Sequence, residues 1–334
     1  MRLTLRRTAD LTFPGFRWWL AAAVVAADVT LVAAMLSHGV RVDEAANVPG
    51  QPRGTASPMP SVSPAPVGGG EFAAAASLPE RPPAQWADGP AGLPTALPVS
   101  SYSPDVAVRA TALGSCTEGG ASLQLTTNAG RSWQDLAVPV RSVLRLRWTG
   151  EQSGWIVGAN ADCRLTLSYT DDSGRTWSKP GPTRGAWHRM GDAAARVVHA
   201  PTGNVPSPCR PGTAIVDVSA VTLYSSAVLC ADGRISRTSD GGARWVTGQV
   251  PNALAIGFAS PDVGYAVVPR TDTCAGLQTL ATADGGRSWR LAGCVRDAAG
   301  PGFGMSFADP ANGLLVAGDG VYRTTDRGTS WKLA

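Results

Sequence analysis

Short hydrophobic runs separated by turn residues fill the C-terminal part of the chain. Residues 143–149, 154–158 and 164–170 read VLRLRWT, GWIVG and RLTLSYT, and similar runs recur further along the sequence. Runs of this length, rich in β-branched and aromatic residues, predict β-strands rather than helices. We therefore expect an all-β domain over residues 95–334.

Five similar octets punctuate these strands. They read TTNAGRSW (126–133), TDDSGRTW (170–177), TSDGGARW (238–245), TADGGRSW (282–289) and TTDRGTSW (324–331). Their tryptophans recur at intervals of 44, 68, 44 and 42 residues, and a period in the forties allows four strands per repeat in a stacked or circular array. The long interval holds residues 178–213, which are too few for a further four-stranded unit, so we expect five units.

Each octet has the composition of a tight turn between the third and fourth strands of its unit. The acid or amide at its third position accepts backbone N–H groups, the glycine at its fifth position adopts positive φ freely, and the tryptophan begins the next strand. These structural residues are Asn128, Gly130, Trp133, Asp172, Gly174, Trp177, Asp240, Gly242, Trp245, Asp284, Gly286, Trp289, Asp326, Gly328 and Trp331. The spacing lacks the alternating acids of a calcium loop, and the three histidines form no ligand cluster. We expect no metal and no cofactor.

The octets resemble the Asp-box, or BNR, repeat of sialidase-like β-propellers, and the resemblance covers about residues 95–334. It departs from the pattern at Asn128, where an Asp is usual, and at Arg244, where a Ser or Thr is usual. The resemblance implies a five-bladed β-propeller of four-stranded blades, with six blades as the alternative. The upstream segments SPDVGYAVV and SGWIVG are most similar to the photosystem II assembly-factor subgroup, which implies protein binding without a reaction. A catalytic sialidase is not expected, because the Arg-Ile-Pro stretch of that family is missing from the sequence.

The six cysteines predict disulfides, since an even number outside the cytoplasm is typical of paired thiols. Each lies near a connection between the second and third strands of a unit, or between successive units, so all six share the face opposite the octets. The simplest pairing is Cys116–Cys163, Cys209–Cys230 and Cys274–Cys294. The first unit begins with an innermost strand and the last ends with an outermost one, so we also expect the ring to close without a shared strand.

The long interval carries the candidate binding residues. Its stretch RGAWHRM contains Arg184, Trp187, His188 and Arg189, and arginine and aromatic side chains on an irregular loop are typical of interfaces. The alternative interpretation is a packed lid in which Trp187 fills a gap.

The N-terminal region predicts a membrane anchor. A basic tail (1–17) precedes the apolar stretch 18–40, which is long enough to span a bilayer, and the arginines favour a cytoplasmic N-terminus. A cleaved signal peptide remains the alternative. Residues 41–94 are rich in proline, glycine and alanine, a composition typical of a disordered linker.

The predicted function is therefore that of a single-pass membrane protein whose extracytoplasmic propeller binds a protein partner or supports assembly. Charged residues make up 16% of the chain and its net charge is +4, without a basic run, so a nucleic-acid partner is not expected. The alternative is a propeller that binds a cell-surface glycan or hydrolyses glycosides. We do not expect an enzyme.

Overall fold

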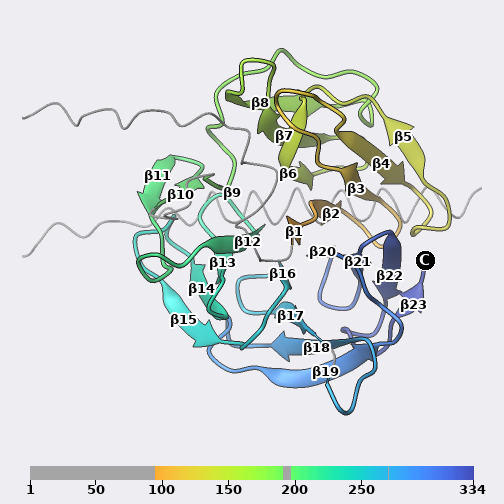
Figure 1. Cartoon of the computed structure of the whole chain (residues 1–334), viewed down its shortest axis with the longest axis vertical. Helices are drawn as coiled ribbons and strands as arrows, with labels where there is room; N and C mark the ends of the chain where they lie inside the picture. Colours follow the sequence, from red (N-terminus) through yellow and green to blue (C-terminus); the bar gives the residue numbers. More distant parts are fainter. Residues whose placement is uncertain (1–94, 191–196, 270) are drawn as a thin grey trace, which may run out of the picture. The chain divides into compact units, whose positions relative to one another are not determined.

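The computed structural model describes residues 95–190, 197–269 and 271–334, all within one of the two units of the chain, Ala75–Ala334. These residues form six β-sheets that follow one another around a common centre (Figure 1). The fold is the expected all-β propeller, but the expectation of five blades is wrong, because the ring has six. The predicted tail (1–17), membrane helix (18–40) and linker (41–94) lie outside the described residues. Among the residues described, no helix has the length and apolar character needed to span a membrane.

We number the sheets in chain order. Sheet 1 consists of β2 (Val99–Ser101), β3 (Ala107–Ala112), β4 (Ser122–Thr126) and β5 (Gln134–Leu136). Sheet 2 consists of β6 (Ser142–Trp148), β7 (Gly154–Ala159) and β8 (Leu165–Thr170). Sheet 3 consists of β9 (His188–Arg189), β10 (Val197–Ala200) and β11 (Gly203–Pro206).

The remaining sheets are more regular. Sheet 4 consists of β12 (Ile215–Ala220), β13 (Ser226–Cys230), β14 (Arg234–Thr238) and β15 (Val246–Gln249). Sheet 5 consists of β16 (Ala255–Phe258), β17 (Gly264–Val268), β18 (Leu277–Thr282) and β19 (Arg290–Val295). Sheet 6 consists of β20 (Gly302–Phe307), β21 (Gly313–Ala317), β22 (Gly320–Thr324) and β23 (Lys332–Leu333), with β1 (Thr95–Ala96) at its inner edge.

Sheet 3 explains why five blades were expected. It is built from the long interval between the second and third octets and contains three short strands instead of four. Its strand β11 takes the outer position, because Val205 lies against Gly242 in the octet of sheet 4, as Leu136 of the outer strand β5 lies against Gly174 in the octet of sheet 2. The interval was too short for four strands, but three strands without an octet are enough to fill one place in the ring.

The ring closes through a segment shared by two sheets, which corrects the expectation of closure without one. Strand β1 pairs in parallel with β20 of sheet 6, and the Leu97 N–H donates to the Phe303 carbonyl at 2.8 Å. The same segment then continues into β2, which pairs with β3 of sheet 1. Gly304 permits this approach, since a Cβ there would lie 1.9 Å from the Leu97 carbonyl oxygen. We call residues 95–101 the clasp segment.

The octet turns and the turns between first and second strands lie on the same face of the ring. In each octet-bearing sheet a backbone N–H of the octet donates to a carbonyl of that sheet's first turn, for example Gly285 to Asp262 and Gly241 to Tyr224, both at 2.9 Å. We call this face the octet face. In an antiparallel meander the other connections lie on the opposite face, which we call the disulfide face.

The disulfide face carries the three bonds that the sequence predicted. Cys116–Cys163 joins sheets 1 and 2, Cys209–Cys230 joins the connection after sheet 3 to sheet 4, and Cys274–Cys294 lies within sheet 5. The predicted pairing is confirmed.

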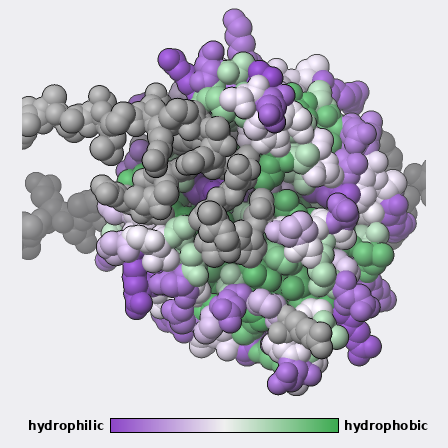
Figure 2. Space-filling model, in the orientation of Figure 1, coloured by the Kyte–Doolittle hydropathy of each residue, from purple (hydrophilic) through white to green (hydrophobic). Residues whose placement is uncertain are grey.

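Hydrophobic side chains pack within and between neighbouring sheets, and the largest cluster lies between sheets 5 and 6 around Tyr265, Phe307 and Leu315. In the view of Figure 2, hydrophilic residues crowd the margin of the molecule, whereas hydrophobic ones show nearer its middle. The hydrophobic core therefore lies between the blades.

Candidate functional site

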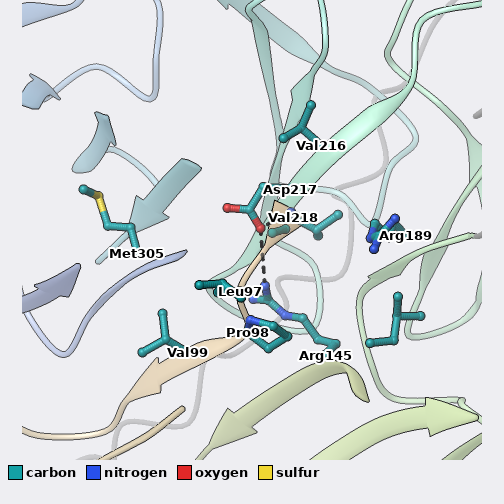
Figure 3. A pocket seen from close by; sticks show the side chains of 11 residues that line it. Leu97, Pro98, Val99, Arg145, Arg189, Val216, Asp217, Val218 and Met305 are labelled. Atoms are coloured by element: carbon teal, nitrogen blue, oxygen red, sulfur yellow. Dashed lines mark hydrogen bonds and ion pairs between the residues drawn. The ribbon is translucent and has the colours of Figure 1, made fainter. Parts of the chain in front are cut away.

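Two cavities lie where the innermost strands converge. The smaller, of about 20 Å³, is lined by the clasp segment residues Leu97 and Pro98 and by Arg145, Arg189 and Asp217. Figure 3 shows Arg145 and Asp217 turned toward each other, with Leu97 and Pro98 beside them. We call the space enclosed by the innermost strands the channel. Because the clasp segment enters it here, little free volume is left in this part of the channel.

The larger cavity has a volume of about 260 Å³ and opens at the octet face. Its walls include Tyr102, Thr149, Val221 and Ala308, which follow the ends of the inner strands β2, β6, β12 and β20. We call this cavity the channel mouth. It is the part of the channel that a ligand can enter.

Serine hydroxyls at equivalent inner-strand positions line the channel mouth. Ser100 accepts the Trp148 N–H of the next sheet at 2.9 Å. In the same way Ser219 accepts the N–H of Phe258, and Ser306 accepts the N–H of Ser101. These bonds tie neighbouring inner strands together, and each leaves the hydroxyl proton available to a further acceptor.

Arg147 occupies the equivalent inner-strand position of sheet 2. Its guanidinium donates to the carbonyls of Ala220 at 2.6 Å and Val221 at 2.7 Å in sheet 4. Arg145, on the same strand, forms an ion pair with Asp217 of sheet 4 at 3.9 Å. Both arginines therefore connect sheets 2 and 4 across the short sheet 3, which provides no full-length inner strand.

Positive charge predominates in the channel. Arg145, Arg147 and Arg189 line the two cavities, whereas Asp217 is the single carboxylate among the described residues that line them. Burial and, to a lesser extent, the positive charge of the nearby Arg145 lower the pKa of Arg147 to about 10. Burial raises the pKa of Asp217, against the opposing effects of Arg145 and of the Ile256 and Val218 N–H groups. Among the described residues that line the two cavities, arginines therefore outnumber carboxylates.

The four predicted binding residues of the long interval lie in different environments. Arg184 is exposed, whereas Trp187, His188 and Arg189 are buried. Only Arg189 lines a channel cavity, and burial lowers its pKa while Asp217 opposes that effect. These side chains do not share one surface. Their role in binding stays a prediction.

Trp187 fills a gap in sheet 4. In sheets 2, 5 and 6 the octet tryptophan packs edge-on against an aromatic at the end of the inner strand, as Trp177 does against Trp148. Sheet 4 has Ala220 at that place, and its octet tryptophan Trp245 instead packs against Trp187, with ring centroids 6.4 Å apart. The Trp187 indole N–H donates to the Leu223 carbonyl at 3.1 Å. Sheet 3 therefore supplies the aromatic partner that sheet 4 lacks.

His188 is buried and stacks on His199, with ring centroids 4.4 Å apart. Its Nδ1 lies 3.0 Å from the Arg189 carbonyl, and its Nε2 is buried without a hydrogen-bond partner among the described residues. Burial lowers the pKa of His188 to about 3, with smaller contributions from His199 and Arg145. The ring is therefore neutral at physiological pH.

The octet acids act within their own turns. In the fourth octet the Thr282 hydroxyl donates to Asp284, and the Ser288 N–H and hydroxyl donate to the same carboxylate. The same pattern recurs at Asp172 and Asp326, with the Arg244 side chain replacing the hydroxyl at Asp240. These bonds lower the pKa of Asp172 to about 2. Because the carboxylates lie in the outer part of separate sheets, they do not converge on one site.

We did not identify the inner-strand residues of the channel mouth from the sequence alone. A signal was present, because aligning the repeats by their strand ends places Ser100, Arg147, Ser219 and Ser306 at one position. One arginine among serines at an equivalent place would have indicated the polar channel.

Comparisons with known proteins give distant likenesses. No protein-family model matches the chain, and no curated protein matches it. Among solved structures, YCF48 bound to a D1 peptide is 15% identical, with 72% of this chain and 81% of that chain covered and a TM-score of 0.29. The SapL1 lectin in complex with alpha methyl fucoside is also 15% identical, with 72% and 95% covered and a TM-score of 0.46.

A GH74 xyloglucanase from Xanthomonas campestris is 17% identical, with a TM-score of 0.30. The match covers 71% of this chain and 38% of the xyloglucanase, so this chain spans well under half of that protein. Likenesses at these identities and TM-scores assign no ligand to this chain.

Proposed function

We propose that this protein is a membrane-anchored, extracytoplasmic propeller that binds a protein partner through its octet face. The observation that carries the proposal is a group of large hydrophobic side chains exposed at that face. Tyr102, Leu223 and Tyr224 lie in first-to-second-strand turns and are 41%, 58% and 62% exposed. Tyr169 lies beside the second octet and is 50% exposed. Tyrosines are enriched among the residues that dominate binding at protein interfaces, and exposed hydrophobic side chains on one face can mark an interaction surface.

The compartment and the anchor are supported by sequence chemistry. Three disulfides and no free cysteine among the described residues suit an oxidising environment outside the cytoplasm. The basic tail and the apolar stretch 18–40 suit an anchor whose N-terminus is cytoplasmic. The linker 41–94 then holds the propeller away from the bilayer.

The hydrogen bonds of the octets support a more specific repeat class for this propeller. We assign them to the Asp-box repeat class, because all five place a threonine hydroxyl, an acid or amide, and a glycine N–H in the same bonding pattern. The protein-binding function fits the assembly-factor subgroup that the upstream segments resemble.

The glycoside-hydrolysing alternative has less support. Glycosidases generally place two carboxyl groups on either side of the scissile bond. The described lining of the channel offers one, Asp217, which is paired with Arg145. A protein-binding role requires no second acid, so we favour it.

The test is crosslinking in native membranes followed by identification of the captured proteins. Replacing both Leu223 and Tyr224 with serine is expected to abolish capture of a specific partner. The control is Leu291→Ser, which changes a leucine that is 61% exposed on the outer strand β19. Equal loss in both variants, or no loss in either, would contradict binding through the octet face.

A further inference from the structure

We propose that the channel mouth binds a carboxylate carried by the protein partner, with Arg147 and the inner-strand serines as its ligands. This inference rests on the proposed function for the source of the carboxylate. It rests on the channel itself for the chemistry.

Hydrogen-bonding capacity in the channel mouth favours an acceptor. Ser100, Ser219 and Ser306 each use an oxygen lone pair to accept a backbone N–H. Their own protons are therefore left as donors at the cavity wall. The carbonyls of Ala220 and Val221 are already engaged by Arg147. The mouth thus offers hydroxyl donors beside the Arg147 guanidinium, which suits an oxygen-rich anion.

Two buried polar atoms belong to residues that line the channel mouth. Neither the Ser101 hydroxyl oxygen nor the Arg145 Nε has a hydrogen-bond partner among the described residues, and both residues line the channel mouth. Buried polar atoms are nearly always paired in folded proteins. A carboxylate at the mouth has two oxygens and can accept from several donors at once.

Charge favours the same ligand. Arg145 and Arg147 lie on one strand and repel each other, and the one carboxylate among the described channel residues, Asp217, faces Arg145 at 3.9 Å. An anion at the mouth compensates the charge of Arg147. The octet carboxylates do not provide this compensation, because they lie in outer turns and their oxygens accept hydrogen bonds there.

The volume of the channel mouth limits what can enter. A cavity of about 260 Å³ accommodates an acidic side chain or a chain terminus but not a folded surface. The exposed Tyr102, at the rim, and the exposed Leu223 and Tyr224, in the first turn of sheet 4, then contact the residues that flank the carboxylate. The ligand is accordingly a short peptide segment with one inserted acid.

The test measures binding of three peptide probes and one sugar probe to the full-length protein in nanodiscs. The probes are acetyl-Gly-Gly-Asp-Gly-Gly-amide, acetyl-pentaglycine with a free carboxyl terminus, acetyl-pentaglycine amide, and glucuronic acid. We expect one or both carboxylate peptides to bind and the amide peptide not to bind. The first two probes distinguish a side-chain carboxylate from a terminal one.

Variants locate the site. Arg147→Met is expected to weaken binding of the carboxylate peptide by about ten-fold or more, and Ser101→Ala by about two- to five-fold. Ser101→Ala keeps the proposal testable if Arg147→Met fails to fold, because the Ser101 hydroxyl has no hydrogen-bond partner to lose among the residues that the structure describes. Arg131→Met is the charge-matched control, since Arg131 is exposed in the first octet, and it is expected to bind like the wild type.

Each outcome decides between the proposals. Equal binding of the amide and carboxylate peptides, or equal weakening by the Arg147 and Arg131 variants, overturns the carboxylate site while leaving protein binding at the octet face intact. Binding of glucuronic acid in preference to both peptides overturns the proposal that a peptide supplies the carboxylate. That result favours a glycan ligand. Carboxylate binding without any crosslinked protein partner supports the site and overturns the proposed function.

Discussion

The two faces of the ring differ in how they are closed, although the same antiparallel repeat builds both. On the disulfide face, three disulfides fix the connections and the clasp segment fills the channel, leaving about 20 Å³. On the octet face, short turns are fixed by their own hydrogen bonds and the channel opens into about 260 Å³. A face that is stabilised by local turns can leave its centre open, and this is where we place binding.

The largest effect is expected from the bond between sheets 1 and 2. Replacing Cys116 and Cys163 with serine removes a crosslink that closes 47 residues and is expected to lower the free energy of unfolding by about 2–5 kcal/mol. Chemical denaturation measures the loss, and hydrogen exchange should locate it in sheets 1 and 2. Binding of the carboxylate peptides should not change. Loss of that binding in a folded variant would show that the two faces are not independent.

A smaller loss is expected from Gly304→Ala at the clasp segment. The added methyl group collides with the Leu97 carbonyl and is expected to cost about 1–3 kcal/mol, seen as a lower Tm and faster exchange across residues 95–101. Gly181→Ala is the control, because a Cβ there meets nothing closer than 3.9 Å. If both variants unfold alike, the clasp segment does not close the ring.

Acid is expected to weaken sheet 3 before the octet turns. His188 has a pKa of about 3 in the folded protein, against the ordinary histidine value of 6.5, so the unfolded chain takes up the proton first as the pH falls. The contribution of His188 to the free energy of unfolding is therefore fully present above pH 6.5 and is lost as the pH falls. The expected loss is about 1 kcal/mol between pH 7 and pH 5.5. His188→Phe should remove this slope in unfolding experiments. An unchanged slope would assign the acid sensitivity to another group.

The smallest effect is expected from one octet acid. Asp284→Ala leaves the Ser288 N–H and hydroxyl without their acceptor and is expected to lower Tm by about 2–4 °C. Asp262→Ala, at an exposed acid in the adjacent turn of the same sheet, is the control and should leave Tm unchanged. A similar Tm for both variants would remove the structural role of the octet.

The repeats made most of the fold predictable. Octet spacing located five of the six sheets, and the position of each cysteine in its repeat was enough to pair all six. Sheet 3 was not predictable in the same way, because it lacks an octet and its strands β9, β10 and β11 are two to four residues long. The clasp segment was missed because two residues of β1 pair with a strand about two hundred positions away, and local patterns carry no such information.

The candidate site was less predictable than the fold. The sequence directed attention to Trp187 and its neighbours, since an aromatic among arginines on a long interval is typical of an interface. Trp187 is instead 1% exposed and packs against Trp245. The channel mouth depends on Arg147 reaching the carbonyls of Ala220 and Val221, more than seventy residues away. Only the closed ring brings these groups together.

Site-specific photocrosslinking in the native membrane tests most directly that the octet face is the binding face. A photoreactive residue replaces Tyr224, which is exposed on the octet face, or Glu118, which is exposed beside Cys116 on the disulfide face. Binding at the octet face is expected to give a protein adduct from position 224 that disappears with Arg147→Met and persists with Arg131→Met, and no adduct from position 118. An adduct from position 118 together with none from position 224 would contradict it.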